Sequence, residues 1–150
     1  MELKEMTEAF FADFGKGRKM VLSTTDGSKV SSRMMSVLLI GDRFYFQTDK
    51  MLRKYSQLKA DHNVALCTDN IQIEGVCEEL GHPLGYKEFC KAFEDCYKGS
   101  YDAYTSLENE RLFEVTPHFI ERWTYKDGVP FIETFDLING SYGLEEYKGI

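Results

Sequence analysis

The sequence has no long apolar run. Its longest uninterrupted apolar stretches are about as long as Val37–Ile40, whereas a membrane-spanning helix needs about 20 such residues. The N-terminal segment Met1–Glu5 is charged at the place where a signal peptide would be apolar. We therefore expect a soluble, cytoplasmic protein that does not act at a membrane.

Cysteine is also scarce, and its spacing is irregular. The four cysteines, Cys67, Cys77, Cys90 and Cys96, include no Cys-x-x-Cys pair and form no zinc-binding pattern with a histidine. The expectation is four reduced cysteines that pack as small apolar residues, without a structural metal.

Positive charge is in short supply overall but is concentrated in one segment. The formal net charge of −7 argues against a general nucleic-acid-binding protein. Residues 16–59 nevertheless contain ten lysines and arginines against three aspartates, a local charge of +7, and the remaining residues carry −14. Such a segment indicates either a local anion-binding site or a solvated surface whose sign is accidental. Charge alone does not decide between these two interpretations.

What the sequence does have is enough apolar and aromatic material for one core. With 150 residues, of which 43% are hydrophobic and 14% aromatic, it fits a single domain spanning residues 1–150. This composition excludes a disordered tail or a fibre. So many rings in a short chain also favour an interface that covers some of them, and therefore a dimer.

The residue pattern predicts short antiparallel strands with helices between them. Met6, Phe10 and Phe14 recur at helical spacing and predict an amphipathic N-terminal helix. The predicted strands cover residues 20–24, 30–40, 44–48, 64–67, 71–77, 112–115, 119–125 and 131–135, and the further helices cover 50–60 and 86–107. Pro117 is expected to interrupt a strand, and the tail after Leu137 is left without a predicted element. Six or more strands of this kind argue for a small β-barrel.

Several polar residues of the basic segment are expected to meet at the start of the second helix. Arg33 lies on the second predicted strand, Thr48 ends the third, and Asp49 is positioned to cap the helix. Arg53 and Lys54 follow in its first turns. A helix N-terminus adds unpaired N–H groups and a positive dipole end, so the pattern predicts a phosphate-binding site. The alternative is a group of basic residues that only face water.

Five segments occur in an informative order: Ser32–Met35, Phe44–Asp49, Arg53–Leu58, Asn63–Leu66 and Glu74-Gly75. This order resembles the FMN-binding split barrel of the pyridoxamine-phosphate oxidase superfamily over about residues 17–82. The layout is most similar to the short nitroimidazole-resistance (Nim) proteins and general-stress flavoproteins. The resemblance implies a mainly β fold with α (α+β), a six-stranded antiparallel split β-barrel flanked by helices, and a homodimer with FMN at the subunit interface.

The resemblance also implies roles for individual residues. Arg33, Arg53 and Lys54 would hold the FMN phosphate, and Asn70 would reach the flavin from the partner subunit. The family has a lysine where this chain has Leu38, and we expect Lys50 to replace it. The main chain and side chains around Met34, Met35 and Ser36 would line the flavin ring, and Gln47 and Thr48 would contact the ring or the ribityl chain.

The function implied by this resemblance is that of an FMN-dependent oxidoreductase that reduces a small aromatic or nitro compound. FMN would carry the electrons, and no side chain is identified as an acid or base. The alternative on the same barrel is a non-catalytic flavin- or haem-binding protein or a stress protein. Oxidation of vitamin B6 is not expected, because the C-terminal half lacks the family's Trp-x-x-x-Pro ending and substrate-binding arginine.

Three further features have competing interpretations. The strand Arg43–Phe46 superficially resembles an aromatic platform for single-stranded nucleic acid, although neighbouring residues on a strand point to opposite faces. His82 is either a catalytic candidate or a turn residue with satisfied hydrogen bonds. Trp123 either packs in the core or lies near the flavin.

Overall fold

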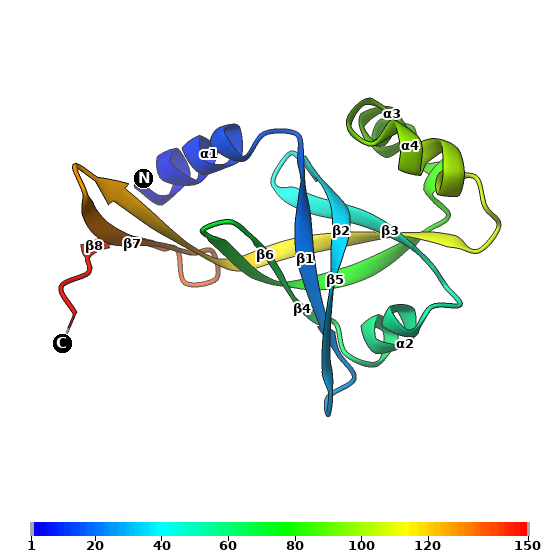
Figure 1. The fold of residues 1–150 in the computed structure, drawn as a ribbon, viewed down its shortest axis with the longest axis horizontal. Helices are drawn as coiled ribbons and strands as arrows, with labels where there is room; N and C mark the ends of the chain where they lie inside the picture. Colours follow the sequence, from blue (N-terminus) through cyan, green and yellow to red (C-terminus); the bar gives the residue numbers. More distant parts are fainter. Residues whose placement is uncertain (1, 150) are drawn as a thin grey trace.

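The structure, a computed structural model, describes residues 2–149, which contain one continuous antiparallel sheet. Its strands are β1 (Gly17–Thr25), β2 (Val30–Ile40), β3 (Arg43–Asp49), β4 (Asn63–Thr68), β5 (Ile71–Gly81), β6 (Glu110–Lys126), β7 (Val129–Asp136) and β8 (Ser141–Glu146). They are ordered β3-β2-β1-β4-β5-β6-β7-β8, and an additional pairing of β3 with β6 closes the first six strands into a barrel (Figure 1). The predicted six-stranded antiparallel barrel, mainly β with helices, is confirmed.

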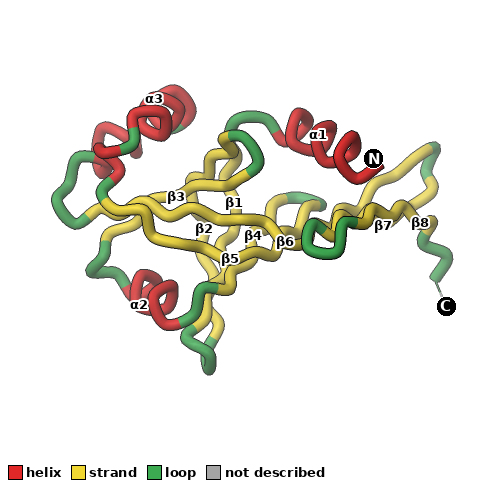
Figure 2. The backbone as a smooth tube through the Cα atoms, turned by 180° about the vertical axis from the view of Figure 1, so that it is seen from behind, coloured by secondary structure: helices red, strands yellow, loops and turns green. Residues whose placement is uncertain are grey.

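The helices cover the outside of this barrel. They are α1 (Glu2–Phe14), α2 (Arg53–Ala60), α3 (Lys87–Cys96) and α4 (Lys98–Ser100), with a 3-10 turn at Pro83–Gly85 and a π-helical turn at Tyr101–Thr105. Both views show α1 and α3 along one side of the barrel and α2 on the other (Figures 1 and 2). Helix α3 packs Phe89 and Phe93 onto Leu38 and Leu112 of the barrel wall. The helical segment expected at residues 86–107 is therefore present as consecutive short helices.

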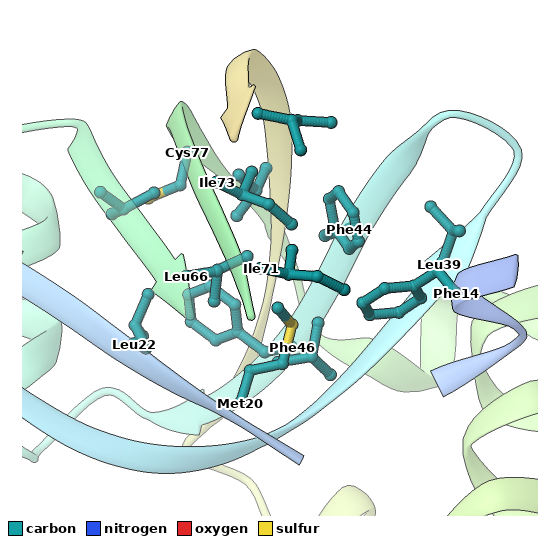
Figure 3. Close-up of a cluster of buried hydrophobic side chains, with 14 of the residues drawn as sticks. Phe14, Met20, Leu22, Leu39, Phe44, Phe46, Leu66, Ile71, Ile73 and Cys77 are labelled. Carbon is teal, nitrogen blue, oxygen red and sulfur yellow. The ribbon is translucent and has the colours of Figure 1, made fainter. Parts of the chain in front are cut away.

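Alternating residues of the barrel strands point inward and form the main core. Met20, Leu22, Phe44, Phe46 and Ile73 are almost completely buried, and Figure 3 shows these side chains gathered toward one another. This inward alternation is what a closed sheet requires of each strand.

Strand β6 runs without a break through Pro117, where the sequence predicted two separate strands. The register between β5 and β6 shifts at Glu74/Gly75, opposite Pro117. A proline has no N–H to donate, so it is tolerated at such an irregularity. Gly75 allows a close backbone approach here, because a Cβ atom at this position would lie 2.4 Å from the Thr116 carbonyl oxygen.

Beyond the barrel, β7 and β8 continue the sheet and carry α1 on one face (Figure 1). The Phe10 ring lies 5.3 Å from the Phe135 ring, and the buried Glu133 carboxylate accepts hydrogen bonds from Arg122 and Tyr142 at 2.8 Å and 2.5 Å. The sequence left the segment after Leu137 without an element, and this was wrong for β8. Strand β8 is polar because it lies at the exposed edge of the sheet. It is held in place by backbone pairing with β7 rather than by burial of apolar side chains.

None of the helices among residues 2–149 is both long and apolar enough to cross a bilayer. The four cysteines are free thiols, but only part of the packing expectation holds. Cys77 is buried, whereas Cys67 and Cys96 are exposed.

Candidate functional site

Arg33 is fixed at the end of the barrel that α2 covers. Its guanidinium donates hydrogen bonds to the Leu22 carbonyl oxygen at 3.1 Å, the Thr24 hydroxyl at 2.8 Å and the Gln57 side-chain oxygen at 3.3 Å. Thr24 and Gln57 are themselves buried and hydrogen-bonded to each other at 2.6 Å. These contacts join Arg33 to β1 and α2 and leave it little freedom. Thr24 and Gln57 were not singled out from the sequence, since their role depends on contacts across three elements.

Two more cations approach Arg33 from the first turn of α2. Partial burial lowers the pKa of Arg33, and the charge of Arg53 lowers it further. Burial likewise lowers the pKa of Lys54, followed by repulsion from Arg33. Within residues 2–149, none of these three side chains forms an ion pair closer than 4 Å. The structure thus places Arg53 and Lys54 near enough to Arg33 for like-charge repulsion, and these are the three cations that the sequence assigned to a phosphate.

The start of α2 differs from the prediction. The helix begins at Arg53 rather than near residue 50, and its N-cap residue, Leu52, provides no side-chain hydrogen bond. Asp49 instead accepts the Met51 N–H at 2.7 Å within the preceding turn. Thr48 therefore does not stand at the helix N-terminus, because a turn of four residues separates the two. The first turn of α2 therefore has no side-chain cap. Its free N–H groups are available to an anion, which can cap the helix in place of a side chain.

The two polar residues at the end of β3 point to opposite faces. Gln47 is buried on the outer face, where its side-chain oxygen accepts a hydrogen bond from Thr105 at 3.0 Å. Thr48 is buried on the inner face, and its hydroxyl oxygen has no hydrogen-bond partner among the described residues. Their contact with a flavin stays a prediction.

Met34, Met35 and Ser36 also alternate along β2. Met34 is 60% exposed, whereas Met35 packs against the barrel core. Successive side chains on a strand point to opposite faces, so the three side chains cannot all line one flat ring. Only Met34 and Ser36 share a face, and their part in flavin binding stays a prediction.

Lys50 and Asn70 lie in turns outside β2 and α2, the elements that carry the three cations, and a role of Lys50 at the phosphate stays a prediction. The Lys50 side chain is exposed in the turn before α2, and its backbone N–H donates to Asn109 at 2.8 Å. Asn70 lies in the turn between β4 and β5, where its amide hydrogen-bonds to the Trp123 carbonyl oxygen. The adjacent Asp69 lies 3.8 Å from Arg18 at the start of β1, whereas the Arg33 guanidinium contacts Leu22 and Thr24 in the later part of that strand. Within one chain Asn70 therefore does not join the cluster.

A carboxyl pair that the sequence did not reveal borders the cations. Asp49 on β3 is directly opposite Glu110 on β6, and Glu110 is 5% exposed. Burial raises the pKa of Glu110 to about 7, and the neighbouring Asp49 charge adds to this shift. Lys54 opposes the shift, since its positive charge favours the ionised carboxylate. Glu110 lies 56 residues after Lys54 in the sequence, and only the β3–β6 pairing places them together.

The donor set fits the phosphate end of a mononucleotide. Two guanidinium groups, one ammonium group and an uncapped helix start are the groups that proteins use to bind phosphate monoesters. Arg33 is already held in place by three hydrogen bonds, which lowers the entropy lost when it binds an anion.

A family model described as "Pyridoxamine 5'-phosphate oxidase" matches residues 6–124, which is most of the chain. The chain belongs to the pyridoxamine 5'-phosphate oxidase family. The match includes β1–β5, α2, the candidate site and β6 as far as residue 124.

Solved structures of the same fold agree with this assignment. PhzG from Burkholderia lata 383, in complex with tetrahydrophenazine-1-carboxylic acid, is 18% identical with a TM-score of 0.61, and the alignment covers 99% of this chain and 91% of that one. A pyridoxamine 5'-phosphate oxidase-related, FMN-binding protein from Nostoc punctiforme PCC 73102 is 10% identical with a TM-score of 0.61, covering 99% and 94%. General Stress Protein 26 from Bacillus anthracis is 21% identical with a TM-score of 0.58, covering 80% and 92%. At these identities the likeness shows the fold. No curated protein matches the chain.

The structure also shows the surroundings of two features that had competing interpretations. Phe44 and Phe46 are completely buried, so the strand Arg43–Phe46 forms no exposed aromatic platform for nucleic acid. His82 accepts the Leu84 N–H at 3.1 Å and contacts the Leu107 carbonyl oxygen at 2.8 Å. It is a turn residue with satisfied hydrogen bonds, as the simpler interpretation had it.

Proposed function

We propose that this protein is a flavoprotein that binds FMN at the α2 cation site and reduces a small aromatic or nitro compound. The observation that carries the proposal is the convergence of Arg33, Arg53 and Lys54 beside an uncapped helix start. Membership of the pyridoxamine 5'-phosphate oxidase family supports it. On this proposal residues 1–150 form one FMN-binding domain.

The chain's own residues would bind and orient the cofactor. Arg33 would hold the phosphate from a fixed position, because β1 and α2 already anchor its guanidinium. Arg53 and Lys54 would add charge and N–H donors from the helix side. FMN, when bound, supplies the electron transfer, and the protein supplies position and shielding from water. The exposed Met34 would lie against the flavin ring.

We further propose that the protein works as a homodimer. Met34, Met51 and Leu52 are 60%, 74% and 48% exposed next to the cations, and a second copy would cover such apolar side chains. The remote position of Asn70 supports the same arrangement, because Asn70 would reach a flavin only from another copy. Light scattering at micromolar concentration would return twice the monomer mass, and a strict monomer would contradict the shared site.

The visible absorption spectrum tests the proposal. Freshly purified protein, or protein mixed with FMN and then dialysed, should keep the two visible bands of an oxidised flavin. The double variant Arg53→Ala/Lys54→Ala should lose most of that flavin. The matched control Lys4→Ala/Lys126→Ala removes the same charge from exposed positions far from the site, and it should retain flavin like the wild type.

Other spectra would support other functions. A colourless protein that keeps no added FMN would contradict the flavoprotein proposal, and a Soret band after mixing with haem would favour a haem-binding protein on the same barrel. A retained flavin that nitroaromatic compounds fail to reoxidise after reduction would indicate storage rather than catalysis.

A further inference from the structure

The buried Glu110 is connected to the cation site through Lys54. Glu110 and Asp49 occupy a directly opposed pair of β3 and β6, so their side chains project from the same face of the sheet. Lys54 lies in the first turn of α2, where the negative charges of Glu110 and Asp49 favour its ammonium form and the positive charge of Arg33 disfavours it. Lys54 is thus the one side chain on which both the acidic pair and Arg33 act.

Two charged side chains, one acidic and one basic, act on the Glu110 carboxylate. Asp49 approaches from β3 and Lys54 from α2. On its own strand, Arg111 donates a hydrogen bond at 2.6 Å to the backbone carbonyl oxygen of Glu110 rather than to its carboxylate. The charge state of Glu110 is therefore set by burial, by one like charge and by Lys54.

We propose that Glu110 controls how tightly this site holds a phosphate monoester, because ionised Glu110 competes with the phosphate for Lys54. This inference rests on the proposed function, since FMN is the phosphate monoester in question. With Glu110 protonated, Arg33, Arg53 and Lys54 are opposed only by Asp49. Ionisation of Glu110 adds a second negative charge, beside that of Asp49, that attracts Lys54. The attraction of Lys54 to the ligand phosphate is weakened accordingly.

The direction of the pH effect follows from this competition. Glu110 ionises around neutral pH because burial raises its pKa to about 7. FMN affinity should therefore fall as the pH rises through this range, and bound phosphate should in turn hold the proton on Glu110. One unit charge at the separation of neighbouring side chains in a partly buried site corresponds to roughly a three- to tenfold change in affinity.

The experiment compares the FMN dissociation constants of the wild type and Glu110→Gln between about pH 6 and about pH 8.5. The FMN phosphate itself titrates near about pH 6, but it does so in both proteins. The ratio of the two dissociation constants, wild type over variant, therefore isolates Glu110. We expect a ratio near one at the acid end that rises several-fold at the alkaline end.

Two outcomes would overturn the inference in different ways. If both proteins bind FMN with a ratio that does not change with pH, Glu110 has no such role and the proposed function stands. If neither binds FMN at any pH, the proposed function fails and takes the inference with it.

A second measurement does not depend on a variant. In ¹³C NMR spectra of the wild type labelled at glutamate side-chain carboxyls, the resonance that titrates near neutral pH should move to a higher midpoint when FMN is added. An unchanged midpoint in the FMN-bound protein would overturn the inference.

Discussion

Substitution of Gly75 by alanine tests how the barrel accommodates Pro117. A Cβ atom at position 75 would lie 2.4 Å from the Thr116 carbonyl oxygen, 3.1 Å from its carbon and 3.2 Å from the Pro117 Cα atom. Ordinary van der Waals contact of a Cβ atom begins near 3.4 Å. All three neighbours are backbone atoms, so β5 and β6 must separate locally to admit the methyl group.

The expected cost follows from that displacement. Overpacking of a well-ordered interior costs about 1–3 kcal/mol, and here it strains the ladder that connects β5 to β6. For a protein of this size, 1 kcal/mol corresponds to about 2–4 °C in Tm. We therefore expect Gly75→Ala to lower the free energy of unfolding by about 2 kcal/mol and Tm by roughly 4–8 °C.

Urea denaturation followed by circular dichroism measures this change. Gly99→Ala is the matched control, because a Cβ atom there meets nothing within 4 Å and Gly99 lies in α4. Alanine should be neutral or slightly stabilising at that position. If Gly75→Ala unfolded at the same urea concentration as the wild type, the close approach of Gly75 to Thr116 would not exist in solution.

Three further predictions concern buried groups. Glu133→Ala should cost about 3–5 kcal/mol in a urea titration, because it leaves the Arg122 guanidinium without its buried partner; an unchanged midpoint would mean that the pair contributes nothing. Burial raises the pKa of the Cys77 thiol to about 12, so mass spectrometry after treatment with a thiol reagent at about pH 8 should find Cys67 modified and Cys77 untouched until the protein is unfolded. Rapid modification of Cys77 in native protein would show that β5 opens readily. Because the pKa of Glu110 is higher in the folded than in the unfolded protein, wild-type stability should fall as the pH rises from about 4.5 to about 7, and Glu110→Gln should abolish this fall; parallel pH profiles would contradict the burial of that carboxyl.

The barrel strands could be predicted because burial in a closed sheet imposes a period of two. Along β1, Met20, Leu22 and Thr24 point inward and are almost completely buried. The same alternation is visible in the sequence as apolar residues two apart. Strand β8 carries no such signal, because it pairs with one neighbour at the edge of the sheet and stays largely exposed. Periodicity therefore predicted the closed part of the sheet and missed its edge.

The candidate site was predicted where its geometry is local. Arg53 and Lys54 follow β3 closely, so a strand–turn–helix pattern places them near the strand end. The cap was predicted wrongly, because Asp49 serves the turn at Met51 instead of the helix. Glu110 was missed because nothing near it in the sequence indicates burial beside Lys54.

The central claim is that Arg33, Arg53 and Lys54 form the phosphate site of a flavin. Fluorescence titration with FMN and with riboflavin, which differs by the phosphate alone, tests it most directly. Three cations around one phosphate should make the wild type bind FMN at least about tenfold more tightly than riboflavin. In Arg53→Ala/Lys54→Ala this preference should fall sharply, because Arg33 alone of the three cations is left to hold the phosphate, while riboflavin affinity stays the same. Equal affinity of the wild type for FMN and riboflavin would contradict the account.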